Sequence, residues 1–160
     1  MKKVFSTVCA VMMCLWLPAG AFANESHEAE PLSAHAPKGG VEEPAKCQVC
    51  GMDRTHFASS RVLVTFANGK TIGTCSINCA REAATQNASS KITAIRVADY
   101  VSKKLIDAKK AVWVIGGSKH GVMSATAKWA FADKAEATRF VSENGGKIAT
   151  FAEAWKAAEF

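Results

Sequence analysis

The chain has 160 residues, a formal net charge of +6 at pH 7 and 49% hydrophobic residues. This length is enough for one ordinary domain or for two very small ones. The basic residues are spread along the chain and form no block of like charge. Nucleic-acid binding needs a clustered basic face, so we do not expect it here.

The first residues have the pattern of an export signal, and we predict a signal peptide over residues 1–23. Two lysines precede an apolar run at residues 4–17, and Ala-Phe-Ala at residues 21–23 matches a cleavage site. The apolar run is too short to span a bilayer stably. Neither Cys9 nor Cys14 follows the small residue that lipid attachment requires. We therefore predict a periplasmic or secreted protein without a membrane anchor.

Residues 24–46 predict a flexible acidic tether. They are rich in Glu, Pro and Gly and contain almost no large apolar side chain. Little burial is available to offset the entropy of ordering such a segment. The isolated histidines His27 and His35 are expected to be solvated side chains.

Residues 47–102 predict a first β-β-α-β unit. The alternating, β-branched sequence of Arg61–Phe66 indicates a strand. Asn68-Gly69 favours a hairpin turn, and Thr74 or Ser76 is suited to cap a following helix. The predicted elements are strands at 61–66 and 70–74, a helix at 76–86 and a strand at 92–97.

Residues 103–160 repeat this order, with the charged stretch Ser102–Lys110 as the join. Asp133 is suited to cap a helix, and Asn144-Gly145-Gly146 to end it. The sequence predicts strands at 111–115 and 128–132, a helix at 134–143, a strand at 147–151 and a short helix at 153–158. The fold class that follows is α+β, with two tandem small β-β-α-β units.

Four cysteines follow the predicted signal peptide, in two pairs. Cys47 and Cys50 lie in a loop, whereas Cys75 and Cys79 are four residues apart at the predicted helix start. That spacing places both thiols on one side of the first turn, where the helix N-terminus favours thiolate. The two pairs could close a four-thiolate site, as in zinc-ribbon and treble-clef-like modules.

Three interpretations of these thiols remain open beside a soft-metal site. The cysteines could bind Zn(II) structurally, or they could form two disulfides in an oxidising compartment. The Cys47–Cys50 pair could also serve a thiol–disulfide oxidoreductase. Redox pairs of this kind normally open a helix, and Gly51 with Asp53 predicts a loop instead.

Methionines favour a soft metal over the alternatives. Met52 follows Cys50 by two residues, and thiolate with thioether favours Cu(I). Met123 lies in the loop between the first two strands of the second unit and offers another thioether. His120 and His56 could each add an imidazole nitrogen. Core packing for Met123 and solvent exposure for both histidines are the simpler expectations.

The chain resembles the NosL family, exported copper chaperones associated with the maturation of nitrous oxide reductase. The resemblance rests on Cys50-Gly51-Met52 and, in the second half, on Val112-Trp113-Val114, Met123, Trp129-Ala130-Phe131-Ala132, Ala137, Phe140 and Gly145–Phe151. It implies tandem β-β-α-β units related to the organomercurial lyase core. It also implies Cu(I) binding through Cys and Met without catalysis.

From this resemblance we expect a periplasmic copper chaperone that passes Cu(I) to a cuproenzyme client such as nitrous oxide reductase. Cys50 would supply the thiolate, and Met52 and Met123 the thioethers. Two departures stand out: typical members are lipoproteins, and Cys47, Cys75 and Cys79 exceed the minimal Cys-Gly-Met pattern. The extra thiols suggest a subgroup that binds another metal, or a second one, and whose client differs.

Overall fold

The structure is a computed structural model that describes residues 41–158. The predicted signal peptide and most of the predicted tether lie outside the described residues. Within the described part, no helix is long and apolar enough to cross a membrane.

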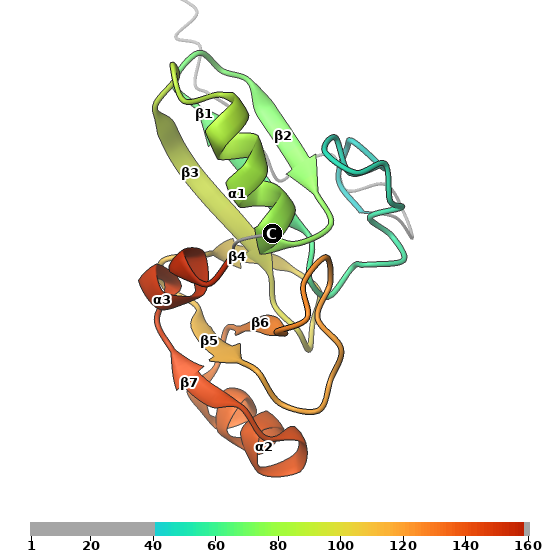
Figure 1. The fold of residues 1–160 in the computed structure, drawn as a ribbon, viewed down its shortest axis with the longest axis vertical. Helices are drawn as coiled ribbons and strands as arrows, with labels where there is room; N and C mark the ends of the chain where they lie inside the picture. The colour runs from blue at the N-terminus through green and yellow to red at the C-terminus, as the bar shows by residue number, and fades with distance from the viewer. Residues whose placement is uncertain (1–40, 159–160) are drawn as a thin grey trace, which may run out of the picture. The chain divides into compact units, whose positions relative to one another are not determined.

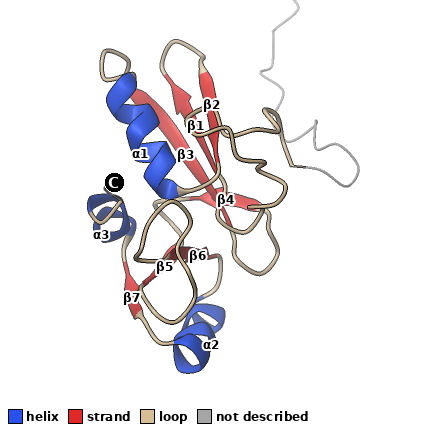
Figure 2. Ribbon diagram, turned by 45° about the vertical axis from the view of Figure 1, so that its right-hand side comes forward, coloured by secondary structure: helices blue, strands red, loops and turns tan. Residues whose placement is uncertain are grey.

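The first sheet has the strand order β2-β1-β3-β4, with all neighbours antiparallel (Figure 1). Helix α1 lies across one face of this sheet (Figures 1 and 2). The elements are β1 (Val62–Phe66), β2 (Thr71–Thr74), α1 (Ile77–Gln86), β3 (Ile92–Ala98) and β4 (Leu105–Asp107). Strand β4 was not predicted: it lies in the stretch expected to join the two units, and it pairs with β3.

The second sheet repeats the arrangement of the first, in the order β6-β5-β7. In both sheets the earliest strand is central, and the next two strands of the chain flank it in antiparallel pairs. The elements are β5 (Val112–Ile115), β6 (Lys128–Phe131), α2 (Lys134–Asn144), β7 (Lys147–Ala149) and α3 (Phe151–Lys156). The prediction of an α+β fold with two β-β-α-β units is confirmed.

Helix caps set several element boundaries. Ser76 caps α1 through a hydrogen bond from the Cys79 amide, and Asp133 caps α2 as predicted. Thr150 forms a capping box with Glu153, which starts α3 at Phe151. The predicted strand at 147–151 therefore ends two residues early, and the predicted helix at 153–158 also begins and ends two residues early.

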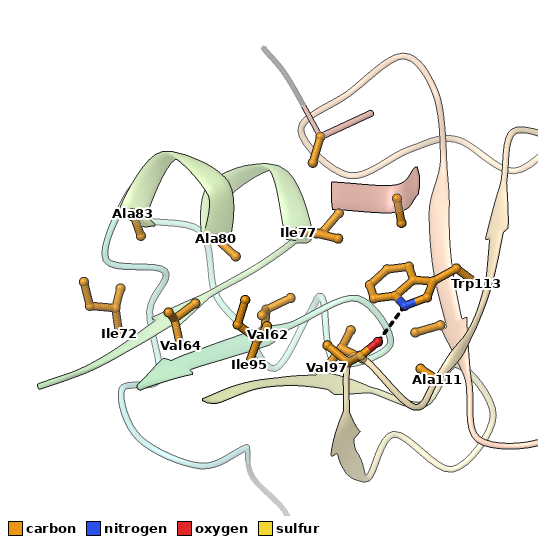
Figure 3. Close-up of a cluster of buried hydrophobic side chains, with 14 of the residues drawn as sticks. Val62, Val64, Ile72, Ile77, Ala80, Ala83, Ile95, Val97, Ala111 and Trp113 are labelled. Atoms are coloured by element: carbon orange, nitrogen blue, oxygen red, sulfur yellow. Dashed lines mark hydrogen bonds between the residues drawn. The ribbon is translucent and has the colours of Figure 1, made fainter. Parts of the chain in front are cut away.

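One apolar core receives side chains from both sheets (Figure 3). Trp113 is 1% exposed in this core, and its indole Nε1 donates a hydrogen bond of 2.9 Å to the carbonyl of Ala108. The next residue, Val114, belongs to a second core that includes Phe131 and Phe140. Because successive side chains of a strand point to opposite faces, β5 contributes to both cores. Because β5 packs into both cores, it holds the second unit in contact with the first.

Candidate metal centre

The first cysteine pair lies in a tight hairpin turn. The Cys47 amide donates to the carbonyl of Met52 at 2.7 Å, and the Gly51 amide donates to the carbonyl of Cys47 at 2.8 Å. Gly51 has φ +78°, a conformation that L side chains rarely adopt. The turn also aims the backbone amides of Val49 and Cys50 at the Cys47 sulfur. Amide donors directed at a sulfur stabilise a thiolate in this position.

The hairpin is attached to the edge of the first sheet. The Gln48 amide donates to the carbonyl of Gly73 at 3.0 Å, and the Gly73 amide donates to Oε1 of Gln48 at 2.9 Å. Gly73 belongs to β2, which runs directly into the second cysteine pair. The sheet edge therefore brings the two pairs together across 25 residues of chain.

The second cysteine pair spans the start of α1. Cys75 precedes the N-cap residue Ser76, and Cys79 lies in the first helical turn. Ser60 fixes the backbone here, because its hydroxyl donates to the carbonyl of Cys75 at 2.8 Å. The first turn of a helix carries a partial positive charge, which favours thiolate. The predicted placement of this pair is thus matched by the structure.

The two pairs converge on one point. The sulfur atoms of Cys47, Cys50, Cys75 and Cys79 all lie within 4.8 Å of one another. The Cys75 sulfur is 3.5 Å from that of Cys50 and 3.7 Å from that of Cys79. All four cysteines are free thiols. A tetrahedral ion with bonds of about 2.3 Å to sulfur needs sulfur separations of about 3.8 Å, so the cluster suits a metal closely.

The thiols perturb one another strongly. Hydrogen bonds from Cys75 and Cys79 lower the pKa of Cys47 far below its ordinary value. The hydrogen bond to Cys47 raises the pKa of Cys75 to about 12, and the same partner raises the pKa of Cys79 further. Hydrogen bonding within the cluster therefore favours the negative charge on Cys47 and the protons on Cys75 and Cys79, which opposes the effect of the helix N-terminus on that second pair. A metal ion must displace these protons when it binds.

Met123 reaches the cluster from the second unit. Its side chain is half-buried and packs against the buried thiols together with Val49, Phe57 and Val122. Its backbone has φ +57°, which is uncommon for a residue other than glycine. The loop between β5 and β6 thus holds a thioether beside four thiols, at a cost in backbone strain.

Three other candidate donors are exposed. Met52 is 37% exposed, although its backbone pairs with Cys47 in the hairpin. His120 is an exposed residue of the loop that carries Met123. His56 is exposed as well, and its ring makes an edge contact with Phe57 at a centroid distance of 5.0 Å. The structure therefore gathers the four thiols and Met123, and leaves Met52, His120 and His56 on the surface.

A buried arginine beside the hairpin was not anticipated. Arg54 has no solvent-exposed side-chain surface, and its Nε donates to the carbonyl of Thr74 at 3.2 Å, next to Cys75. Its guanidinium also donates to the carbonyls of Glu42 and Pro44 and forms an ion pair with the Glu42 carboxylate. Arg61 donates to the same carboxylate at 3.0 Å. In the sequence, the only indication that Arg54 supports the site is its position shortly after Cys50.

This arginine network corrects the predicted tether. Val41 is 6% exposed, and Glu42 pairs with both Arg54 and Arg61. Residues 41–46 are therefore packed against the first unit, although composition alone predicted a flexible segment as far as residue 46. The remaining residues of that prediction, 24–40, lie outside the described part of the chain.

A second unanticipated contact links the two units near the cluster. Lys128 on β6 is 8% exposed, and its ammonium donates to Oδ1 of Asn78 at 3.3 Å and to the hydroxyl of Ser124 at 2.9 Å. Asn78 lies between Ser76 and Cys79 on the first turn of α1. Burial lowers the pKa of Lys128. This contact ties the loop that carries Met123 to the helix that carries Cys79.

Comparisons with known proteins agree with this architecture. The family model described as NosL matches residues 38–158. Among solved structures, the chain is similar to the crystal structure of the copper chaperone NosL from Shewanella denitrificans, with a TM-score of 0.57 and 20% sequence identity. That match covers 74% of this chain and 94% of the other. No curated protein matches the chain. Because the family model spans most of the sequence, the chain belongs to the NosL family.

Proposed function

We propose that this protein is an exported copper chaperone that binds Cu(I) at its sulfur cluster. The observation that carries the proposal is the packing of the Met123 side chain against four thiols that lie within 4.8 Å of one another. Thiolate and thioether are the donors that Cu(I) prefers. Family membership and the fold shared with a copper chaperone support the same function.

The exposure of the cluster suits copper transfer. Cys47, Cys75 and Cys79 are buried, whereas Cys50 is partly exposed and Met52 is 37% exposed. A partner's ligand can therefore reach copper through the Cys50 side while the buried thiols still hold it. Ligand exchange of this kind passes a metal between proteins without releasing the free ion. It needs binding and transfer only, so we assign no catalytic reaction.

We place the protein in the periplasm, where the predicted signal peptide would direct it. Its client would be a cuproenzyme such as nitrous oxide reductase or a copper-delivery partner. The additional thiols beyond Cys-Gly-Met leave room for a different client within the same class. We expect no contact with nucleic acid.

A competition experiment tests Cu(I) binding. The reduced protein is titrated anaerobically with Cu(I) in the presence of bathocuproine disulfonate, and loss of the coloured chelate measures the affinity. We expect the protein to withdraw Cu(I) from the chelator. We also expect the loaded protein to transfer Cu(I) to a metal-free cuproenzyme faster than the Cu(I)–chelator complex does. Retention of all copper by the chelator would refute the proposal.

A resident Zn(II) site is the second candidate function. The sulfur separations of 3.5 and 3.7 Å come close to the value of about 3.8 Å that a tetrahedral zinc site needs. In that case zinc would copurify at one ion per chain, and Cu(I) would not displace it. Metal analysis of protein purified anaerobically distinguishes this outcome from the first.

A further inference from the structure

The sulfur donors outnumber the ligands of a single copper ion. Four thiols share one cluster, Met123 packs against it, and Met52 follows Cys50 by two residues. One Cu(I) ion is fully coordinated by about three or four soft donors. A single ion would leave one or two of the five gathered sulfur atoms without a bond to metal.

Charge compensation points in the same direction. Cys47 is 3% exposed, and Cys75 and Cys79 are 0% exposed. Several thiolates around one monovalent ion would leave uncompensated negative charge in a buried site, which is costly. Arg54 is the nearby buried cation, but Glu42 already pairs with its guanidinium. Each additional Cu(I) that takes the place of a thiol proton lets another sulfur bind metal without adding negative charge to the site.

The position of Cys75 suits a bridging ligand. Its sulfur lies 3.5 Å from that of Cys50, 3.7 Å from that of Cys79 and within 4.8 Å of that of Cys47. It therefore lies in close contact with one thiol of the first pair, Cys50, and with its own partner in the second pair, Cys79. A thiolate sulfur has enough lone pairs to bind two Cu(I) ions at once.

We propose that the cluster binds more than one Cu(I) per chain, as a thiolate-bridged copper cluster in which Cys75 is the bridging ligand. This inference rests on the proposed function and adds its stoichiometry. Each ion that enters replaces thiol protons, which pass to solvent. Copper remains Cu(I) and sulfur remains thiolate, so no electrons are exchanged.

The number of bound ions and the X-ray absorption spectrum, both measured on the unmodified protein, test the inference. The reduced protein is loaded anaerobically with Cu(I) supplied as its acetonitrile complex, and native mass spectrometry counts the bound ions. We expect two or more ions per chain, with a copper–copper vector in X-ray absorption spectra and luminescence under ultraviolet light. Saturation at one ion would overturn the bridged cluster and leave the chaperone proposal intact. Absence of tight Cu(I) binding would overturn both.

Two variants locate the bridge. Cys75→Ser should lower the stoichiometry to one Cu(I) and abolish the copper–copper vector, while Ser59→Ala, a neighbouring change outside the cluster, should behave as the unmodified protein. Circular dichroism confirms that each variant is folded. If Cys75→Ser folds and retains the full stoichiometry and the vector, Cys75 is not the bridge and the proposal is wrong. If Cys75→Ser does not fold, the presence or absence of a copper–copper vector in the unmodified protein decides whether the cluster is bridged.

Discussion

Gly73 and Arg54 are packed so closely that a Cβ atom on Gly73 would lie 2.8 Å from Cζ of Arg54. The same atom would lie 2.7 Å from Cδ of Pro44. Contacts this short do not occur at real Cβ atoms, so the neighbours would have to move. The guanidinium can approach β2 closely enough to bond the carbonyl of Thr74 only because residue 73 has no side chain.

Gly73→Ala should therefore destabilise the first unit and weaken the metal site. We expect a loss of about 1–3 kcal/mol, as for other overpacked interior positions, because Arg54 and Pro44 must both shift. Urea denaturation and Cu(I) competition measure the two effects. Gly69→Ala is a suitable comparison: nothing lies within 4 Å of its Cβ position, so only its φ of +82° opposes the change. If Gly73→Ala and Gly69→Ala bind Cu(I) equally tightly, the close packing of Gly73 against Arg54 does not affect the metal site.

Arg54→Lys should not preserve stability, although it preserves charge. The guanidinium bonds Thr74, Glu42 and Pro44 at once, and an ammonium cannot reproduce that planar fork. Arg54→Ala would leave the Glu42 carboxylate without this partner and should cost about 3–5 kcal/mol. Denaturant midpoints of both variants, measured against Lys46→Ala at an exposed site, provide the test. If Arg54→Lys has the same denaturant midpoint as the unmodified protein, the several hydrogen bonds of the guanidinium are not needed for stability.

Glu42 should make stability depend on acid pH. Burial alone would raise its pKa, but the hydrogen bond and charge of Arg61 and the charge of Arg54 lower it below the ordinary value of 4.5. A carboxyl whose folded pKa is lowered contributes stability that is present above the unfolded pKa and is lost as pH falls through the folded pKa.

Glu42→Gln should consequently be less stable than the unmodified protein at neutral pH, and the difference should shrink below about pH 4.5. Urea titrations at a series of pH values measure it. The other carboxylates are present in both proteins, so their titration cancels in the comparison. If the difference in unfolding free energy stays constant from neutral to acid pH, protonation of Glu42 does not contribute to the acid sensitivity of the fold.

The sequence was sufficient for local features whose signals are contained within a few residues. The alternation in Arg61–Phe66, the Asn68-Gly69 turn and the Asp133 cap each depend on neighbours in the chain. Strand β4 lacked such a signal, because its three residues become a strand only by pairing with β3. The start of α3 was misjudged although Thr150 and Glu153 form a local capping-box pattern, which the prediction did not use.

The candidate site divides in the same way. Cys75 and Cys79 were placed at a helix start by spacing, and the structure has them there. Arg54 and Lys128 were missed because their partners, Glu42 and Asn78, are identified only by tertiary contacts. Composition cannot reveal that a glutamate in an acidic stretch is partly buried beside an arginine.

Met123 provides the sharpest test of the site. Met123→Leu keeps nearly the same volume and apolar character but removes the sulfur. If the thioether binds copper, this variant should lose Cu(I) affinity and keep its unfolding midpoint. If Met123 only packs against the thiols, the affinity should be unchanged.

Three further variants complete the series. Met123→Ala should lose affinity in the same way, and it should also lose some stability, because its half-buried side chain packs against the cluster. Met52→Ala should weaken binding with little effect on stability, since that side chain is 37% exposed. Cys50→Ser should lose more affinity than either methionine variant, because it removes a cysteine sulfur of the cluster, 3.5 Å from that of Cys75. Chelator competition and thermal melts on the whole series separate ligands from packing residues. Full Cu(I) affinity in Met123→Leu would mean that copper, if bound, is held by the first unit alone.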